Sequence, residues 1–143
     1  MDPKPPDVIV LGGEWRERAL LRAQLIEDGH DVVAVDTWPI PQLHRGTGMR
    51  PRVLLIDLHA WPRPRETLDA LRIVLPPERI LVVTALGSLT GDEVREHGFN
   101  VIERPASIGQ IVAKVGELLS RTPAEYLDNN YTKAHAGPME RGR

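Results

Sequence analysis

The residues most able to do chemistry follow the short apolar segments of the sequence. Asp57 ends one such run and Arg104-Pro105 follows another, while Thr84 and Ala85 lie within a third. A carboxylate can accept a phosphoryl group, bind a cation or pair with an arginine. A guanidinium can bind a carboxylate or a phosphate at two points at once. These residue types indicate phosphate or carboxylate chemistry, provided that the fold brings them together.

Two glycines and an aspartate suggest a different chemistry. Gly12 and Gly13 follow the first apolar run and precede a helical pattern, so they could cradle a phosphate, with Asp36 after the second run binding a ribose. However, the stretch GGEWRER lacks the later glycines that let a pyrophosphate approach the helix. A nucleotide-binding Rossmann-like domain is therefore the second, less supported, of two alternatives to the main hypothesis of a signalling domain.

The apolar segments alternate with helical patterns along the chain. Strands are expected at 8–11, 31–36, 52–58, 80–86 and 100–103, and helices at 15–27, 66–75, 88–97 and 108–119. At most a short helix is expected around 42–45, because the surrounding stretch is rich in proline and glycine. Five strands joined through helices predict an α/β fold, a doubly wound parallel sheet with helices on both faces.

Two of these helices have apolar residues at helical spacing, and we expect those of the last helix to form one stripe that covers the sheet. In the last helix they are Ile108, Ile111, Val112, Val115, Leu118 and Leu119. In the first helix, which Gly29 should end, they are Trp15, Ala19, Leu20, Ala23, Leu25 and Ile26.

A parallel sheet binds ligands at the carboxyl ends of its strands, where all the candidate residues lie. This set of positions resembles the receiver domain of two-component response regulators over roughly residues 7–121. The resemblance implies a flavodoxin-like sheet with strand order 2-1-3-4-5. It also makes Asp57 the phosphoacceptor position, and it makes Thr84, Ala85, Arg104 and Pro105 the switch and phosphate-binding positions.

The resemblance fails at the metal site. Receivers carry two adjacent acids after the first strand, which hold Mg²⁺ together with the phosphoacceptor, and Gly12-Gly13 stands in their place here. Only Glu14 remains nearby, at a position that usually points away from the metal in the family. Arg104 replaces the family's lysine, and an Arg104–Asp57 ion pair could lock the site. We therefore expect no cofactor and no metal at these degenerate positions.

The main hypothesis is a stand-alone pseudo-receiver of bacterial signalling, a phosphorylation-independent protein-interaction module rather than an enzyme. Its partner would be a histidine kinase, another signalling protein or a second copy in a homodimer. The last helix, the loop before it and the tail would select that partner. The first alternative is a phosphate-accepting response regulator modified at Asp57, with Glu14 and water completing a weak Mg²⁺ site.

Composition narrows the remaining possibilities. The 143 residues suit one domain at 1–121, followed by a polar tail at 122–143 that we expect to be mobile. The net charge of −2 argues against binding to nucleic acid or to a membrane, and we expect neither a membrane span nor a signal peptide, because the apolar segments are short. The absence of cysteine fits the cytoplasm, and the five histidines show no metal-ligand spacing.

Overall fold

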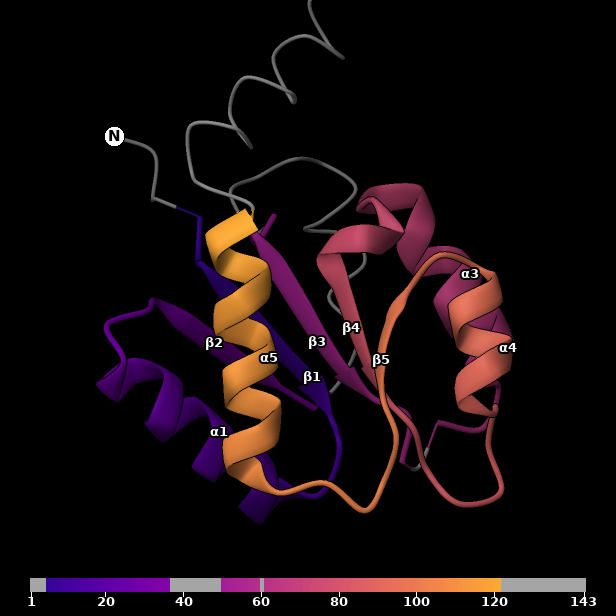
Figure 1. Ribbon diagram of the computed structural model, residues 1–143, viewed down its shortest axis with the longest axis horizontal. Helices are drawn as coiled ribbons and strands as arrows, with labels where there is room; N and C mark the ends of the chain where they lie inside the picture. Colours follow the sequence, from indigo (N-terminus) through magenta and orange to yellow (C-terminus); the bar gives the residue numbers. More distant parts are fainter. Residues whose placement is uncertain (1–4, 37–49, 60, 122–143) are drawn as a thin grey trace, which may run out of the picture.

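A single parallel sheet organises the computed structural model, which describes residues 5–36, 50–59 and 61–121. Its strand order is β2-β1-β3-β4-β5, as the family resemblance implied (Figure 1). The strands are β1 (Val8–Gly12), β2 (Val32–Val35), β3 (Val53–Asp57), β4 (Ile80–Val83) and β5 (Asn100–Ile102). The short helix expected around 42–45 and the tail at 122–143 lie outside the described residues.

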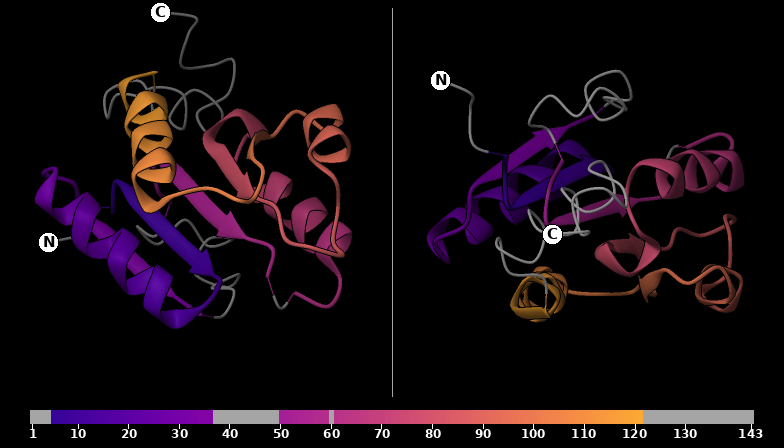
Figure 2. Two further views of the ribbon diagram at one scale, coloured as in Figure 1. Left: turned by 60° about the horizontal axis from the view of Figure 1, so that its bottom comes forward. Right: turned by 90° about the horizontal axis from the view of Figure 1, so that it is seen from above.

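Helices cover both faces of the sheet, and Figure 2 shows α5 and α3 on opposite sides of it. Alternate strand residues point to opposite faces. Val8 and Val10 pack with α1 and α5, whereas Ile9 and Leu11 pack with α3 and α4. The helices are α1 (Trp15–Glu27), α3 (Pro64–Val74), α4 (Gly91–Glu96) and α5 (Ile108–Arg121), with a 3₁₀ turn, η1, at Pro77–Arg79.

The expected helix over 15–27 is confirmed by α1, but Leu25 alone among the six apolar residues named for it is buried. Leu21 and Leu25 are its buried residues, whereas Trp15, Leu20 and Ile26 are exposed. Apolar side chains surround this helix, so their spacing does not select one face. Leu21 and Leu25 are the buried residues because they face the sheet and α5. Gly29, with a φ of +94°, follows the end of the helix as expected.

The prediction for the last helix is confirmed, whereas the predicted end of the fourth strand is wrong. The α5 stripe is confirmed, because Ile111, Val115 and Leu118 are buried against the sheet and Ile108 is partly buried. The fourth strand was expected to reach residue 86 but ends at Val83. Beyond Val83 the backbone keeps one bond to the next strand, from the Thr84 N–H to the Ile102 carbonyl (3.0 Å). No helix in the described ranges is long and apolar enough to cross a membrane.

Candidate functional site

The carboxyl ends of the strands bring the expected site residues together at one edge of the sheet. Gly12 pairs with Asp57 in the register of β1 and β3, and Asp57 pairs with Val83 in that of β3 and β4. The Arg104 backbone N–H then donates to the Thr84 hydroxyl at 3.2 Å. The prediction that Asp57, Thr84 and Arg104 share this edge is thus confirmed by the geometry.

Arg104 lies at the centre of an ion-pair network. Its Nη2 donates to Asp57 Oδ2 and also to Glu17 Oε1, at 2.5 Å from the latter, while its Nη1 donates to Glu17 Oε2 at 3.2 Å. The other Asp57 oxygen, Oδ1, accepts from the His59 backbone N–H at 2.8 Å. Asp57 is only 7% exposed. The expected Arg104–Asp57 pair is present, and both oxygens of Asp57 accept hydrogen bonds.

Glu17 is the site residue that sequence reasoning missed. It lies in the first turn of α1, which starts three residues after β1 ends, at Gly12. A helix that follows a strand so closely places its first turn over the carboxyl edge of the sheet. An acid in that turn was therefore the available signal. Glu14, which was singled out instead, is exposed and caps α1 by accepting from the Arg16 backbone N–H at 3.0 Å.

The two carboxylates that share Arg104 have opposite pKa shifts. The hydrogen bonds from Arg104 lower the pKa of Glu17, which outweighs the effect of its partial burial. Burial raises the pKa of Asp57, and the negative charge of Glu17 acts in the same direction, against Arg104 and the His59 N–H. The same hydrogen bonds raise the pKa of Arg104, so the guanidinium stays charged. Arg104 stabilises the charge of Glu17 more than that of Asp57.

Gly12 and Gly13 have backbone angles and close neighbours that both disfavour a side chain. Their φ angles are +78° and +84°, in the left-handed region. A Cβ atom added to Gly12 would lie 2.5 Å from Trp61 Nε1, and one added to Gly13 would lie 3.0 Å from the Cβ of Asp57. Trp61 and Asp57 thus occupy the volume that side chains at 12 and 13 would need.

The residues present do not fit the Mg²⁺ ion that the family resemblance implies. Mg²⁺ needs octahedral oxygen ligands at short distance, usually including one or two free carboxylates. Here Glu17 and Asp57 are both bonded to Arg104, and Glu14 caps its own helix. Within the part of the chain that the structure describes, no three His, Asp or Glu side chains gather in a way that could hold a metal.

Two open hollows flank Arg104. One, of about 210 Å³, is lined by Glu14, Glu17, Asp57, His59 and Arg104. The other, of about 580 Å³, is lined by His59, Ala85, Leu86, Arg104, Pro105 and Ala106, with a cis peptide bond joining Arg104 to Pro105. The predicted positions Ala85 and Pro105 therefore line a hollow beside the ion-pair network without entering the network.

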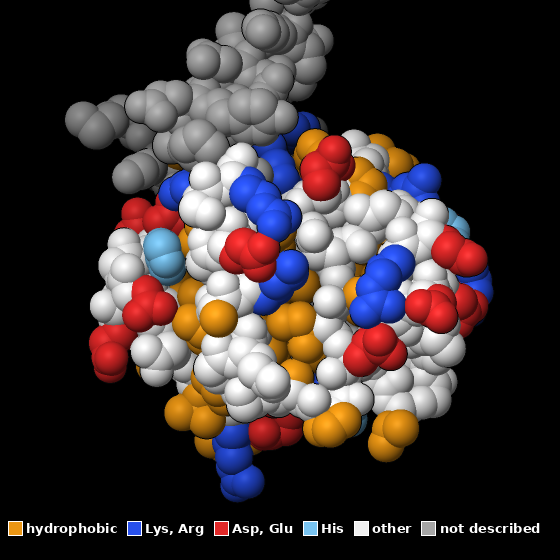
Figure 3. Space-filling view, viewed as in Figure 1, with side chains coloured by type: hydrophobic (Ala, Val, Ile, Leu, Met, Phe, Trp, Pro, Cys, Tyr) orange, Lys and Arg blue, Asp and Glu red, His pale blue; other side chains and the backbone are white. Residues whose placement is uncertain are grey.

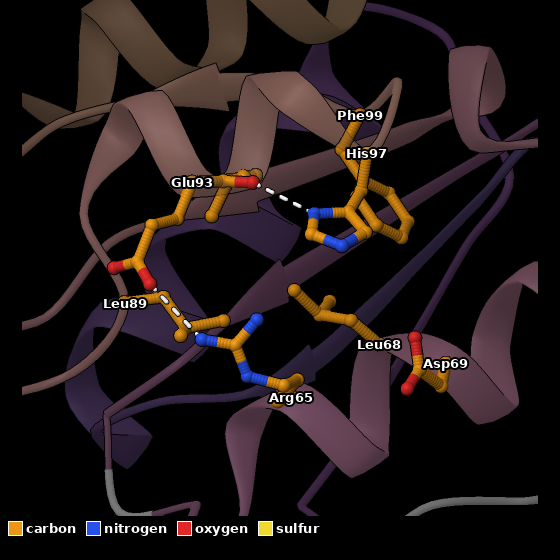
Figure 4. Close-up of a pocket in the computed structure, with 8 residues that line it drawn as sticks. Arg65, Leu68, Asp69, Leu89, Glu93, His97 and Phe99 are labelled. Carbon is orange, nitrogen blue, oxygen red and sulfur yellow. Dashed lines mark hydrogen bonds and ion pairs between the residues drawn. The ribbon is translucent and has the colours of Figure 1, made fainter.

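A third hollow lies away from this edge, between α3 and α4 (Figure 4). Arg65 on α3 donates to Glu93 on α4 at 3.0 Å, and the Phe99 ring lies beside the His97 imidazole. Its volume of about 10 Å³ holds roughly one water molecule. This hollow is too small to bind a metabolite.

Comparisons with known proteins identify the fold. No family model matches the sequence, and no curated protein matches it either. Among solved structures, the chain is similar to the receiver domain of a Francisella response regulator, with 20% identity, a TM-score of 0.63, and coverage of 82% of this chain and 99% of the other. It is also similar to a response regulator receiver domain protein from Clostridium thermocellum, with 14% identity, a TM-score of 0.64, and coverage of 80% and 94%.

A third similar structure is the BeF3-activated receiver domain of nitrogen regulatory protein C, with 21% identity, a TM-score of 0.62, and coverage of 83% of this chain and 98% of the other. At these identities the likeness concerns the fold. The protein has the flavodoxin-like fold of response-regulator receiver domains, with the same strand order that the family resemblance implied.

Proposed function

We propose that this chain, which folds as receiver domains do, is a two-component-type signalling domain that works through protein contacts without phosphorylation. The observation that carries the proposal is the network in which Arg104 binds Asp57 and Glu17 together. In a receiver, a metal ion and a lysine would neutralise the charge of the transferred phosphoryl group. Here a guanidinium already neutralises the acceptor carboxylate.

The surroundings of Asp57 support an inert acceptor. Phosphoryl transfer depends on positioning and on electrostatic stabilisation of the transferring oxygens, which the metal mostly supplies. Trp61 covers Gly12, where the acidic pair of a receiver would begin, and the remaining acids are engaged elsewhere. We therefore assign no catalytic step to this chain, and its partners would be other signalling proteins in the bacterial cytoplasm.

The nucleotide-binding alternative receives little support from the geometry. A Cβ atom at Gly12 would contact the Trp61 indole, so the turn is covered on that side. Arg18 also donates to the Gly13 carbonyl at 3.0 Å, which fixes the turn from the α1 side. Neither contact leaves the open, glycine-lined surface that a pyrophosphate needs. We expect a panel of nucleotides to leave the thermal unfolding midpoint unchanged.

Intact-mass measurement after incubation with acetyl phosphate and Mg²⁺ tests the proposal. We expect no phosphorylated species, because the transferring oxygens would lack a metal ion. The Asp57→Asn variant is the matched control, since any mass gain that it keeps arises at another residue. Stoichiometric modification of the wild-type chain that this variant loses would overturn the proposal in favour of a phosphate-accepting response regulator.

A further inference from the structure

The outer face of α1 carries apolar side chains that nothing in the site explains. Trp15 is 62% exposed and Ile26 is 43% exposed, and Ala19 and Ala23 between them are exposed too. We call these four residues the α1 outer stripe. Leu20, 58% exposed, lies at its side. Apolar side chains reach the surface over α1 in Figure 3. An apolar stripe exposed along one face of a helix is suited to contact with another protein surface.

Two opposite charges lie on one side of the stripe, at opposite ends of the helix, and Arg22 lies on the other side. Arg16 lies in the first turn of α1 and Glu27 is its last residue. They are eleven residues apart, about three helical turns, so both lie on the same side of the stripe. A cation at a helix N-terminus and an anion at a C-terminus both oppose the helix dipole. This helix therefore places both charges where they disfavour its own dipole but would suit an antiparallel neighbour.

We propose that the α1 outer stripe is the interface of a weak two-fold homodimer in which the two α1 helices pack antiparallel. The two-fold axis would pass near residue 21, midway between Ala19 and Ala23. Trp15 of one copy then meets Ile26 of the other, and the small alanines face each other at the centre. Arg16 of one copy meets Glu27 of the other. With the axis at residue 21, the partners in all three pairings lie within about one helical residue, about 1.5 Å, of each other along the helix.

The Arg16 side chain is already arranged for such a contact. Its guanidinium lies over the Trp15 ring, 5.4 Å from the ring centroid, so the ring and the charge form one feature at this end of the stripe. The second copy would bring Ile26 to the ring and Glu27 to the guanidinium. A two-fold interface needs such a self-complementary surface, in which each patch recognises its own counterpart.

The size of the stripe sets the strength of the dimer. A helix of 13 residues is about 20 Å long, and one face of it buries less than the roughly 800 Å² per partner of a standard interface. We therefore expect a reversible dimer that forms only at high protein concentration. The inference does not depend on the proposed function, because the stripe lies outside the Arg104 network.

Sedimentation velocity of the full chain from roughly 10 μM to 1 mM, the range expected for a weak interface, tests the dimer. We expect the sedimentation coefficient to rise with concentration. Arg16→Glu and Glu27→Arg should each weaken dimerisation about tenfold, because each creates two like-charge pairs per dimer. The double variant Arg16→Glu/Glu27→Arg should restore it.

The same variants separate the interface from the fold. Each single substitution improves the match between the charge and the helix dipole, so the thermal unfolding midpoint of the monomer should stay the same or rise. Ile73→Glu, at a 76% exposed apolar residue on α3, is the control that should leave dimerisation unchanged.

Three outcomes would overturn the inference. The first is a monomer throughout the concentration range, which would mean that another protein or another segment of the chain covers the stripe. The second is a dimer that both single variants leave intact, which would place the interface on another face. In the third, the single variants weaken the dimer but the double variant fails to restore it, which excludes the antiparallel pairing.

Discussion

At the scale of single residues, the arginine at position 104 decides the chemistry of the site. A planar guanidinium offers several N–H groups in a fixed fork, whereas a lysine ammonium is a compact point charge. Arg104 uses that fork to bind Glu17 with two nitrogens while keeping Asp57 as a second partner. The arrangement satisfies a nearly buried aspartate without a metal ion. Asp57 is thus a structural partner of Arg104 in this protein.

The glycine at position 12 is the residue whose replacement should reveal this packing most directly. Gly12→Ala should lower the free energy of unfolding by about 3 kcal/mol, because the new methyl group meets the Trp61 indole and adopts a left-handed φ. Urea denaturation measures the loss, and Trp fluorescence should report displacement of the indole.

Gly29→Ala is the matched control for this substitution. Gly29 has a similar positive φ, but a Cβ atom there would meet nothing within 4 Å. Gly29→Ala should lower the free energy of unfolding by only about 1 kcal/mol, the effect of the left-handed backbone alone. Equal losses at the two positions would show that the contact between Trp61 and Gly12 is not tight.

At the scale of elements, α1 has three roles on three of its sides. Its inner side packs Leu21 and Leu25 into the core, and its first turn carries Glu17 to Arg104. Its outer side carries the exposed apolar stripe. The last helix is simpler, because its apolar residues lie on one side and are buried together. Because apolar residues lie on several sides of α1, their spacing does not identify its inner face.

Two leucines of α1 test which side of the helix holds the fold together. Leu25→Ala should lower the free energy of unfolding by about 3 kcal/mol, because Leu25 is fully buried and its truncation leaves a cavity. Leu20→Ala should change the free energy of unfolding by less than about 0.5 kcal/mol, since Leu20 is largely exposed. Urea denaturation at low protein concentration measures both. A larger loss for Leu20 than for Leu25 would contradict the assignment of the inner side.

At the scale of the whole molecule, ion pairs at opposite ends of the sheet tie the stability to pH. Burial tends to raise the pKa of Asp7, but hydrogen bonds from the Asp31 N–H and from Arg52 lower it overall. Arg52 also donates to the Leu119 carbonyl at 2.7 Å, which joins this end of the sheet to α5. The Glu17 pKa is lowered at the other end. Asp57 acts in the opposite sense, since its pKa is raised.

The signs of these shifts predict a loss of stability in acid. A lowered pKa, as for Asp7 and Glu17, gives stability that is present above the unfolded values of 3.8 and 4.5 and is lost as the pH falls through the folded values. The raised pKa of Asp57 costs stability at neutral pH, and that cost disappears as the pH falls towards 3.8. Glu17→Gln should therefore be less stable than wild type by about 1 kcal/mol at pH 7.

Urea denaturation of the wild type and Glu17→Gln between pH 7 and pH 3 measures this linkage. We expect the difference between the two proteins to shrink below about pH 4.5, because Glu17 of the unfolded chain takes up a proton there while Glu17 of the folded chain, whose pKa is lowered, is still charged. Glu14→Gln is the control, because its amide oxygen can still cap α1 and the Arg104 network is unchanged. A difference between wild type and Glu17→Gln that is constant across this range would show that the charge of Glu17 does not contribute.

Local sequence patterns determined most of the fold. Continuous aliphatic runs marked the five strands, Gly29 marked the end of α1, and the regular spacing of α5 identified its buried side. Because strands in a parallel sheet end at one edge, the positions of Asp57, Thr84 and Arg104 could also be predicted. These features depend on residues that are neighbours in the sequence, or on a rule that holds for every parallel sheet.

Only the tertiary structure decided how the side chains at that edge combine. The pairing of Glu17 with Arg104 joins residues 87 positions apart, and the cover over Gly12 comes from Trp61 in a loop after another strand. The inner face of α1 also depends on which neighbours reach it. Such contacts depend on distances between separate elements, which the spacing of residues within one element does not contain. The sequence located the site, and the packing of distant residues determined its chemistry.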